Sequence, residues 1–404
     1  MMTKQPTNLR RRRFIRTIGG GVIFAALPIS GCSSFSSDIP ESAIAAWSPE
    51  EIVNDISDPR IRALAWAILA PNPHNRQPWL IELQGKYDVL IRIDTERLLE
   101  HTDPYGRQIL IGTGAMLGLL DIAAKQFGYN TETTWFEEGV FNSTSINSKP
   151  IARVRFIRSI ELANHDLFNH ISKRRTARSV YDNNTPPTKA LKSELLSLGT
   201  PLLDNRVIVE KKHAYLSDHI KRIAKKAWKI ELTTPNTYLE SAQLLRVGSM
   251  EIEKHRDGIS ITSPLLVAFE RFGLFDRNEF PSPDSRIVKA QLDDFNQTVD
   301  ATPSFYVLTS QDNTRLTQIM AGKTYVKAHL IATKHGFVMH PISQALQEFP
   351  EMSQLHSELK EKLISKTPTS DATVQMLCRI GRIPNGKTLP KPSPRRGLHA
   401  YLVN

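Results

Sequence analysis

Two long apolar segments place the strongest constraint on how this chain of 404 residues can fold. The segments 107–127 and 314–335 each carry apolar residues at helical spacing, and each ends at a ring-bearing residue followed by glycine, a common residue just past a helix C-terminus. A short apolar strand accompanies each helix, at 151–157 and at 304–309. The repetition predicts an α+β fold of two related units, although the sequence shows no strict internal repeat.

Around these helices the chain divides into a first unit, 48–165, and a second unit, 166–404. In the first unit, apolar residues at helical spacing on both sides of Pro59 predict two short helices between 48 and 70. The second unit begins with a helix, continues through an irregular middle part and ends in a strand, a helix and a strand. Further strands are predicted at 79–83 and 89–93, which form a hairpin, and at 374–380.

The first 32 residues have the pattern of an export signal rather than of a folded element. Arginines come first, a glycine-containing apolar stretch follows, and small residues precede Cys32. The apolar stretch is shorter than the roughly 20 apolar residues of a permanent membrane helix, which predicts a cleavable signal. A basic tail with an incidental cysteine is the alternative interpretation.

Two parts of this signal resemble known export motifs. Segment 11–16 resembles the twin-arginine consensus, and segment 29–32 resembles a lipobox, in which the cysteine thiol receives a diacylglycerol. The resemblances imply export of the folded protein by the twin-arginine pathway and anchoring to a membrane of the cell envelope through lipidated Cys32. Residues 33–47 are expected to form a flexible tether. Cys32 and Cys378 offer no disulfide framework, as expected of a chain that folds before export.

The net charge of +11 does not predict nucleic-acid binding. Six basic residues precede Cys32, where no acidic residue occurs, and the remaining surplus lacks a basic run interleaved with aromatic residues. That surplus fits a solvated surface or a phosphate site. The twelve histidines show no metal-ligand spacing, so no metal site is predicted. Glycines between 112 and 118 miss the dinucleotide fingerprint by one position and lie inside a predicted helix.

A segment rich in proline and amide side chains, 71–79, is the most specific candidate site. Three prolines fix its backbone, so its amide groups can be presented to a planar ligand that carries donors and acceptors. A purely structural turn would use the same residue types. The candidate contacts are Pro71, Asn72, Pro73, Asn75 and Gln77.

This segment resembles the Pro-Ser-X-X-Asn-X-Gln-Pro-Trp motif of the nitroreductase superfamily, in which the loop lies along FMN. It departs from the motif at Asn72, where the family often has serine. The matching positions are Pro71, Asn75, Gln77, Pro78 and Trp79.

A basic run at 173–178 is the second candidate, since guanidinium groups and a hydroxyl suit a phosphate monoester. A solvated basic face is the alternative. The run resembles the Arg-X-Ser-X-Arg/Lys segment with which the nitroreductase family holds the FMN phosphate and ribityl chain, with threonine in place of serine. The residues concerned are Arg174, Arg175, Thr176 and Arg178.

Two later segments complete the resemblance. Residues 340–344 resemble the family segment that passes the flavin N5, so Ser343 and Gln344 are expected at the cofactor; an ordinary turn is the alternative. Arg395 and Arg396 resemble a C-terminal basic element that returns to the phosphate, where a solvated tail is the alternative.

Together these matches resemble the double-length, Acg-type branch of the nitroreductase superfamily, in which two halves form an intramolecular pseudo-dimer. The resemblance implies a monomer with one FMN site, because only the second unit has an arginine-rich opening. It also implies an oxidoreductase in which NAD(P)H passes hydride to flavin N5 and a small electron-poor molecule accepts the electrons. No catalytic side chain is predicted, since the flavin carries the chemistry.

The alternative function is an FMN-binding or flavin-sequestering envelope protein without turnover, because an envelope location has no obvious supply of reduced nicotinamide. The segment 245–275 is expected to cover the site as a lid, with Gly258 as its hinge.

Replacement of Cys32 by serine removes the thiol that would receive the diacylglycerol. The Cys32→Ser protein is therefore expected to leave the membrane fraction of a bacterial host and to incorporate no labelled fatty acid. Cys378→Ala, which changes the other cysteine, should behave like the wild type. Equal labelling of wild-type and Cys32→Ser protein would contradict lipidation at this position.

Overall fold

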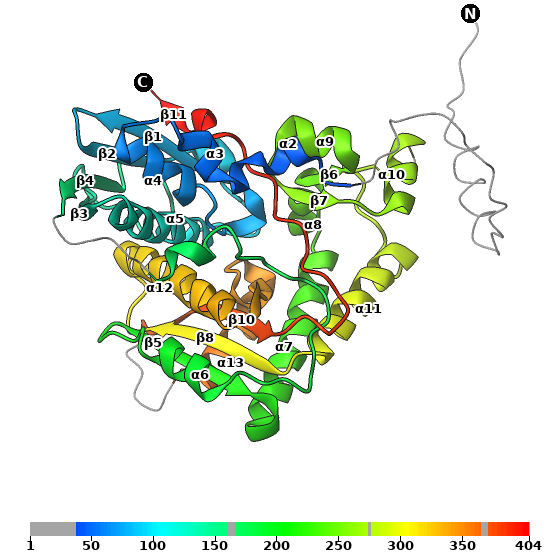
Figure 1. Ribbon diagram of the computed structural model, residues 1–404. Helices are drawn as coiled ribbons and strands as arrows, with labels where there is room; N and C mark the ends of the chain where they lie inside the picture. Colours follow the sequence, from blue (N-terminus) through cyan, green and yellow to red (C-terminus); the bar gives the residue numbers. More distant parts are fainter. Residues whose placement is uncertain (1–37, 160–165, 274–275, 365–370, 404) are drawn as a thin grey trace, which may run out of the picture. The chain divides into compact units, whose positions relative to one another are not determined.

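The computed structural model describes residues 38–159, 166–273, 276–364 and 371–403, all within one compact unit (Figure 1). The predicted signal, including Cys32, lies outside the described residues. The tether prediction is wrong for its last part: α2 (Glu41–Ile44) is followed by a 3-10 turn that ends at Trp47, whose side chain is only 8% exposed. This indole donates to the Ser393 carbonyl at 2.8 Å, so the far end of the chain explains why the segment is folded.

The first sheet has five strands in the order β11-β1-β2-β4-β3. Its strands β1 (Trp79–Gln84) and β2 (Asp88–Ile93) form the predicted hairpin, and β4 (Ala152–Arg158) is the predicted strand that follows. The strand β3 (Tyr129–Trp135) was not predicted from the sequence.

The last strand, β11 (Leu402–Val403), is contributed by the predicted second unit but pairs in parallel with β1, where Leu402 lies opposite Ile81. The C-terminal residues therefore belong to the sheet of the first half, and the chain does not divide cleanly at residue 166.

The second sheet has four antiparallel strands in the order β5-β8-β10-β9. The predicted strands are confirmed as β8 (Ser304–Ser310) and β10 (Thr373–Gly381); β5 (Leu203–Val209) and β9 (Val338–Pro341) were not predicted. Every residue of β8 is buried because both faces are covered, with Tyr306 and Leu308 in one apolar cluster and Phe305 and Val307 in the other.

The two predicted long helices, α5 (Arg107–Gln126) and α12 (Arg315–Lys334), lie side by side between the sheets (Figure 1). A methyl group on Gly114 would lie 2.0 Å from the carbonyl oxygen of Ile319, and one on Gly322 would lie 2.0 Å from that of Ile111. Each helix thus has a glycine at the point where the backbone of the other helix lies closest, and a larger residue would not fit there. The described part of the chain has one helix apolar and long enough to cross a membrane, α5, and most of it is buried inside the protein.

The remaining helices cover the sheets and build a lateral extension. Pro59 separates α3 (Pro49–Val53) from α4 (Pro59–Ala67) as predicted, and Asp58 caps α4 by accepting from the backbone N–H of Arg60 at 2.9 Å. The second sheet is covered by α6 (Lys189–Leu196), α7 (Ala214–Thr233) and α13 (Ser353–Leu363). The extension consists of α8 (Pro235–Gln243), β6 (Leu245–Val247), α9 (Gly248–His255), β7 (Ile259–Ile261), α10 (Pro264–Arg271) and α11 (Arg286–Asp300).

Each half thus supplies one sheet and one long central helix, and the halves pack against each other along these helices. The predicted α+β architecture of two paired halves is confirmed.

Gly322→Ala is expected to lower the free energy of unfolding by about 1–3 kcal/mol or more, because the added methyl meets backbone that cannot rotate away. The check is the midpoint of urea denaturation. Gly199→Ala is the control, since the nearest atom to its added methyl is 3.3 Å away. A Gly322→Ala protein as stable as the wild type would show that the helices are free to separate.

Candidate functional site

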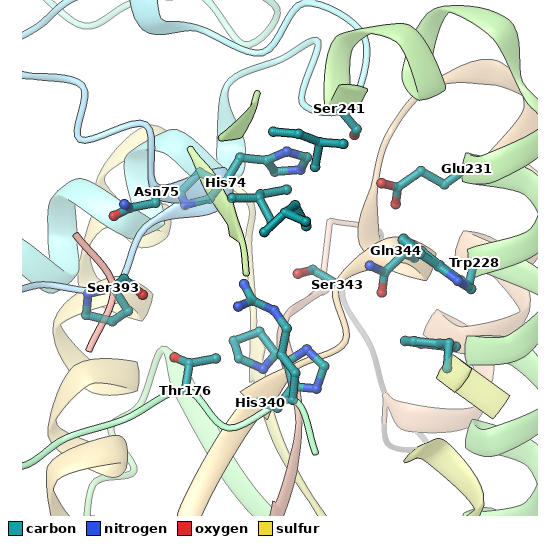
Figure 2. A pocket seen from close by; sticks show the side chains of 18 of the residues that line it. His74, Asn75, Thr176, Trp228, Glu231, Ser241, His340, Ser343, Gln344 and Ser393 are labelled. Atoms are coloured by element: carbon teal, nitrogen blue, oxygen red, sulfur yellow. The ribbon is translucent and has the colours of Figure 1, made fainter. Parts of the chain in front are cut away.

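A cavity of about 800 Å³ opens beside α5 and α12 and is lined by residues of both halves. Its volume lies in the upper part of the range of small-molecule and cofactor sites. Figure 2 shows Asn75 and Ser393 on one side of it, Glu231 and Gln344 on the other, and Ser343 between them.

The proline-rich loop that lines one wall holds three non-glycine residues in the left-handed region. The φ values are +47° at His74, +53° at Asn75 and +52° at Gln77. Such conformations cost about 1–3 kcal/mol each and persist where surrounding contacts impose them. The loop lies directly on α5, since a methyl on Gly112 would be 2.9 Å from the Cβ of Asn72.

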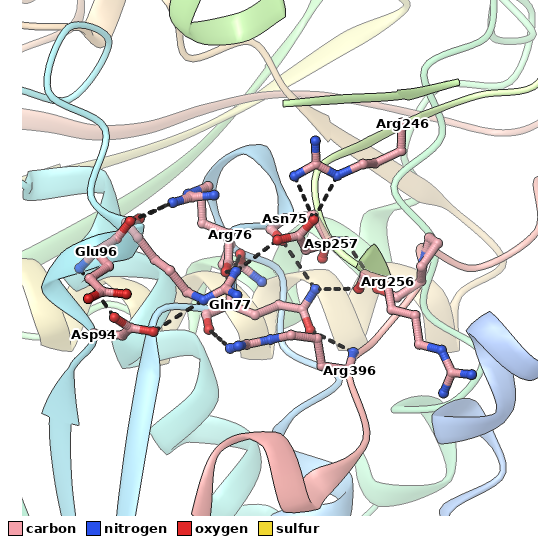
Figure 3. Close-up of polar contacts among 12 residues, drawn as sticks. Asn75, Arg76, Gln77, Asp94, Glu96, Arg246, Arg256, Asp257 and Arg396 are labelled. Carbon is pink, nitrogen blue, oxygen red and sulfur yellow. Dashed lines mark hydrogen bonds and ion pairs between the residues drawn. The ribbon is translucent and has the colours of Figure 1, made fainter. Parts of the chain in front are cut away.

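Hydrogen bonds from Gln77 hold this strained loop in place (Figure 3). The Gln77 backbone N–H donates to Asn72 Oδ1 at 2.8 Å, and its side-chain amide donates to the carbonyls of Asn75 at 3.1 Å and Arg256 at 2.9 Å. Asn75 in turn donates to the Pro394 carbonyl at 3.0 Å. Gln77 is fully buried and stabilises the loop from behind.

Arg395 binds the carbonyls of the turn that directly follows α4. Its Nε donates to the Ile68 carbonyl at 2.9 Å, its Nη2 donates to the Leu69 and Ala70 carbonyls at 3.2 and 3.0 Å, and its Nη1 donates to Asn75 Oδ1 at 2.6 Å. A helix carries partial negative charge at its C-terminus, so a guanidinium next to it is stabilising. Burial lowers the pKa of Arg395 to about 10, which leaves it charged at neutral pH.

Arg174 also binds the turn after α4, but one of its N–H groups has no acceptor among the described residues. One Nη donates to the Leu69 carbonyl at 3.0 Å, whereas the buried Nε has no hydrogen-bond partner among the described residues. Burial lowers the pKa of Arg174 to about 9. Arg175 donates to the Ser172 carbonyl at 2.7 Å and lies over the ring of Trp47 at 4.9 Å.

Arg178 differs from these arginines because it is accessible to water and has no hydrogen-bond acceptor or carboxylate partner among the residues that the structure describes. Its side chain lines the cavity, and the protein atoms around it remove part of its hydration, which lowers the pKa of Arg178. Thr176, two residues earlier, pairs with Met339 of β9 in a parallel bridge, which places the basic run beside that strand. An unpaired guanidinium in a cavity is suited to an anion.

The segment after β9 forms the floor of the cavity. His340 accepts from Arg379 at 3.1 Å, and burial together with this arginine holds the pKa of His340 well below its usual range. The imidazole is therefore neutral at physiological pH. Ser343 and Gln344 line the cavity, and the buried Gln344 Oε1 has no partner among the described residues.

The wall formed by the end of α7 was not foreseen, because α7 is an ordinary amphipathic helix in the sequence. Glu231, near the end of α7, is 4% exposed, and burial raises its pKa to about 7. On the opposite wall burial lowers the pKa of His74 to about 4. A single glutamate in a helix gives no sequence signal that separates a cavity residue from a solvent-facing one.

The structure brings most of the predicted contacts together around one cavity but leaves two outside its lining. Gln77 and Arg396 bind each other instead: the Arg396 backbone N–H donates to Gln77 Oε1 at 3.0 Å, and its guanidinium donates to the Gln77 carbonyl at 2.7 Å (Figure 3). The predicted residues that line the cavity are Pro71, Asn72, Pro73, Asn75, Arg174, Arg175, Thr176, Arg178, Ser343, Gln344 and Arg395.

The segment predicted as a lid also contributes to the cavity wall, through residues that include Leu245, Ile261 and Phe269. Whether it moves stays a prediction. Within the described ranges, no group of three or more His, Cys, Asp or Glu side chains could hold a metal ion, and Cys378 is a buried free thiol.

The chain matches no protein-family model. It is 24% identical over 349 residues, 83% of this chain and 88% of the relative, to a protein named "Putative NAD(P)H nitroreductase" in two strains of Mycobacterium tuberculosis. This similarity supports the nitroreductase superfamily.

Two solved structures also match the chain, at lower sequence identity. A "putative nitroreductase" from Anabaena variabilis is 10% identical with a TM-score of 0.43, over 91% of this chain and 95% of that one. A nitroreductase with bound FMN from Bacteroides fragilis is 13% identical with a TM-score of 0.33, over 58% of this chain and 97% of that one.

Proposed function

We propose that this chain is an FMN-dependent NAD(P)H oxidoreductase of nitroreductase type. The observation that carries the proposal is the convergence of three distant stretches on one cavity: the strained loop at 71–77, the basic run at 174–178 and the segment at 343–344. Each of them resembles a flavin-contacting segment of the superfamily that the sequence similarity supports.

The residues present fit a flavin phosphate ester. Arg178 and the free Nε of Arg174 offer donors that no described protein group accepts, which suits a phosphate. Gly112 has no side chain to keep the loop away from α5, so Asn72 and Pro73 pack directly on this helix, where all three residues line the cavity. Arg395 is occupied by backbone carbonyls and is expected to position the loop rather than to bind phosphate.

When bound, FMN would supply the redox chemistry, accepting hydride at N5 from NAD(P)H and reducing a small electron-poor acceptor. The chain would contribute position and charge: the guanidinium groups of Arg174 and Arg178 would hold the anionic end, and the proline-rich loop together with Ser343 and Gln344 would line the space for the ring. The neutral His340 adds no positive charge to this region.

The second candidate function is flavin binding without turnover. The contacts between the extension and the proline-rich loop favour it. The backbone N–H of Gly258 donates to the Asn75 carbonyl at 3.3 Å, and Gln77 donates to the Arg256 carbonyl at 2.9 Å. These bonds hold the extension against the loop. If the extension covers a bound flavin, it has to move before a nicotinamide can reach the ring.

We further propose that the protein acts as a monomer attached to the cell envelope by lipidated Cys32. The pairing of two halves within one chain supports the monomer, and the order of basic, apolar and small residues before Cys32 supports the anchor.

Arg178→Ala is expected to weaken FMN retention by about tenfold to about a hundredfold, because charge-assisted hydrogen bonds contribute about 1.5–3 kcal/mol. The measurement is the dissociation constant for FMN by flavin fluorescence. Lys173→Ala is the matched control, since it removes an exposed cation of the same run that does not line the cavity. Equal FMN affinity in both variants would remove the phosphate assignment.

NADPH is expected to bleach the yellow colour of the purified, FMN-loaded protein, and a nitroaromatic compound should restore it. Stopped-flow absorbance measures both steps. Rapid bleaching supports turnover, whereas a protein that stays yellow under excess NADPH supports flavin storage.

A further inference from the structure

The wall of the cavity formed by α7 contains a buried carboxyl group without a cation. The Glu231 carboxyl accepts a hydrogen bond from Gln347 Nε2 at 3.0 Å, and hydrogen bonding by the neighbouring Ser241 hydroxyl also acts to lower its pKa. The charged group that acts on it is another acid, Glu240. Among the described residues no lysine, arginine or histidine forms an ion pair with Glu231. A buried carboxylate normally has such a partner.

Other oxygen atoms around Glu231 also lack donors. Gln347 is 4% exposed, and because its amide nitrogen is given to Glu231, its Oε1 remains without a partner. Gln344 Oε1 is likewise buried and unpartnered among the described residues, and the buried Ser241 hydroxyl lies beside Glu231, to which it can donate. All four residues line the cavity, and Figure 2 shows Glu231 between Ser241 and Gln344. This end of the cavity therefore contains buried hydrogen-bond acceptors without protein donors among the described residues, so a ligand that carries donors would satisfy them.

Apolar side chains also line this wall of the cavity. Trp228 lies one turn before Glu231 on α7, and its ring packs at a tilt against Phe295 of α11 with centroids 5.2 Å apart. Leu232, next to Glu231 on α7, and Phe269 are further lining residues. A ligand that fits here has a hydrocarbon body and a compact group carrying several N–H donors.

We propose that this end of the cavity binds an apolar primary amine, with its ammonium group on Glu231 and the oxygens of Gln344 and Gln347, and its body against Trp228 and Phe295. This binding involves no redox step, and any role of the bound amine beside a flavin rests on the proposed function.

The charge of Glu231 gives this binding a defined pH dependence. Burial raises its pKa to about 7, so the group is mainly neutral at pH 6 and mainly ionised at pH 8. His74 and His340, whose pKa values burial lowers, stay neutral over this range. The charged group near Glu231 is Glu240 on α8. The charged side chains that line the rest of the cavity are Asp294, Arg107, Arg174, Arg175, Arg178, Arg286, Lys391 and Arg395. Preference for a cation should therefore rise with pH.

The test is calorimetric titration of the purified protein with 4-phenylbutylamine and with 4-phenylbutanol, which has the same body without the charge. At pH 8 the amine should bind about tenfold to about a hundredfold more tightly than the alcohol. At pH 6 the preference should shrink. Equal binding of the two probes at pH 8, or no binding of either, would overturn the proposal.

Glu231→Gln should abolish the preference for the amine at pH 8 and leave alcohol binding intact, which also shows that the site has folded. Asp218→Asn removes an exposed carboxylate from the same helix and should keep the preference. A Glu231→Gln protein that still prefers the amine would refute the assignment. If that variant does not fold, the pH dependence of the wild type decides.

Titration without NADPH separates this proposal from the proposed function. A protein that prefers the amine but does not bleach retains this site and loses the oxidoreductase assignment. A protein that bleaches but binds both probes equally loses only this site.

Discussion

A backbone contact between two helices is the constraint on which the rest of the structure depends. Gly114 of α5 and Gly322 of α12 each face a carbonyl of the other helix, at a separation that leaves no room for a methyl group. Packed helices with larger side chains at the contact keep their axes about 8–10 Å apart. Because α5 also supports the proline-rich loop through Gly112, and α12 places Tyr325 in the cavity wall, this close contact decides whether the two halves share one cavity.

The strain in the loop is compensated by residues from the end of the chain. Three left-handed conformations between His74 and Gln77 would not persist in an isolated loop. Arg395 binds the carbonyls in front of the loop and Asn75 within it, and the pairing of β11 with β1 holds Arg395 in place. The C-terminal segment thus acts as a structural part of the first half. This explains why an arginine expected at a phosphate is instead occupied by the backbone.

The elements that could be predicted from the sequence are those whose structure is determined by residues close together in the chain. The two long helices follow from apolar spacing and a terminal glycine, and the hairpin follows from alternation around a turn. The short strand β9 could not be predicted, because its pairing partner lies more than thirty residues away in β10. Trp47 was assigned to a tether because its burial depends on Arg174, Arg175 and Ser393, which composition near residue 47 does not reveal. The wall with the arginines was predicted because the basic run resembles a family segment. The wall with Glu231 was not predicted because the sequence around Glu231 contains no motif.

The two walls of the cavity have opposite electrostatic needs. The charge of Arg178 lowers the pKa values of His74 and His340, whereas the charge of Glu240 raises those of Glu231 and His74. Both charges therefore act on His74. Unpaired charges in a protein interior are costly, and neither end has a protein partner for its charge among the described residues. Such an arrangement is stable when an anion occupies one end and a donor-rich group occupies the other. A ligand pair bound in this way cannot exchange ends, so the cavity imposes an orientation before any chemistry takes place.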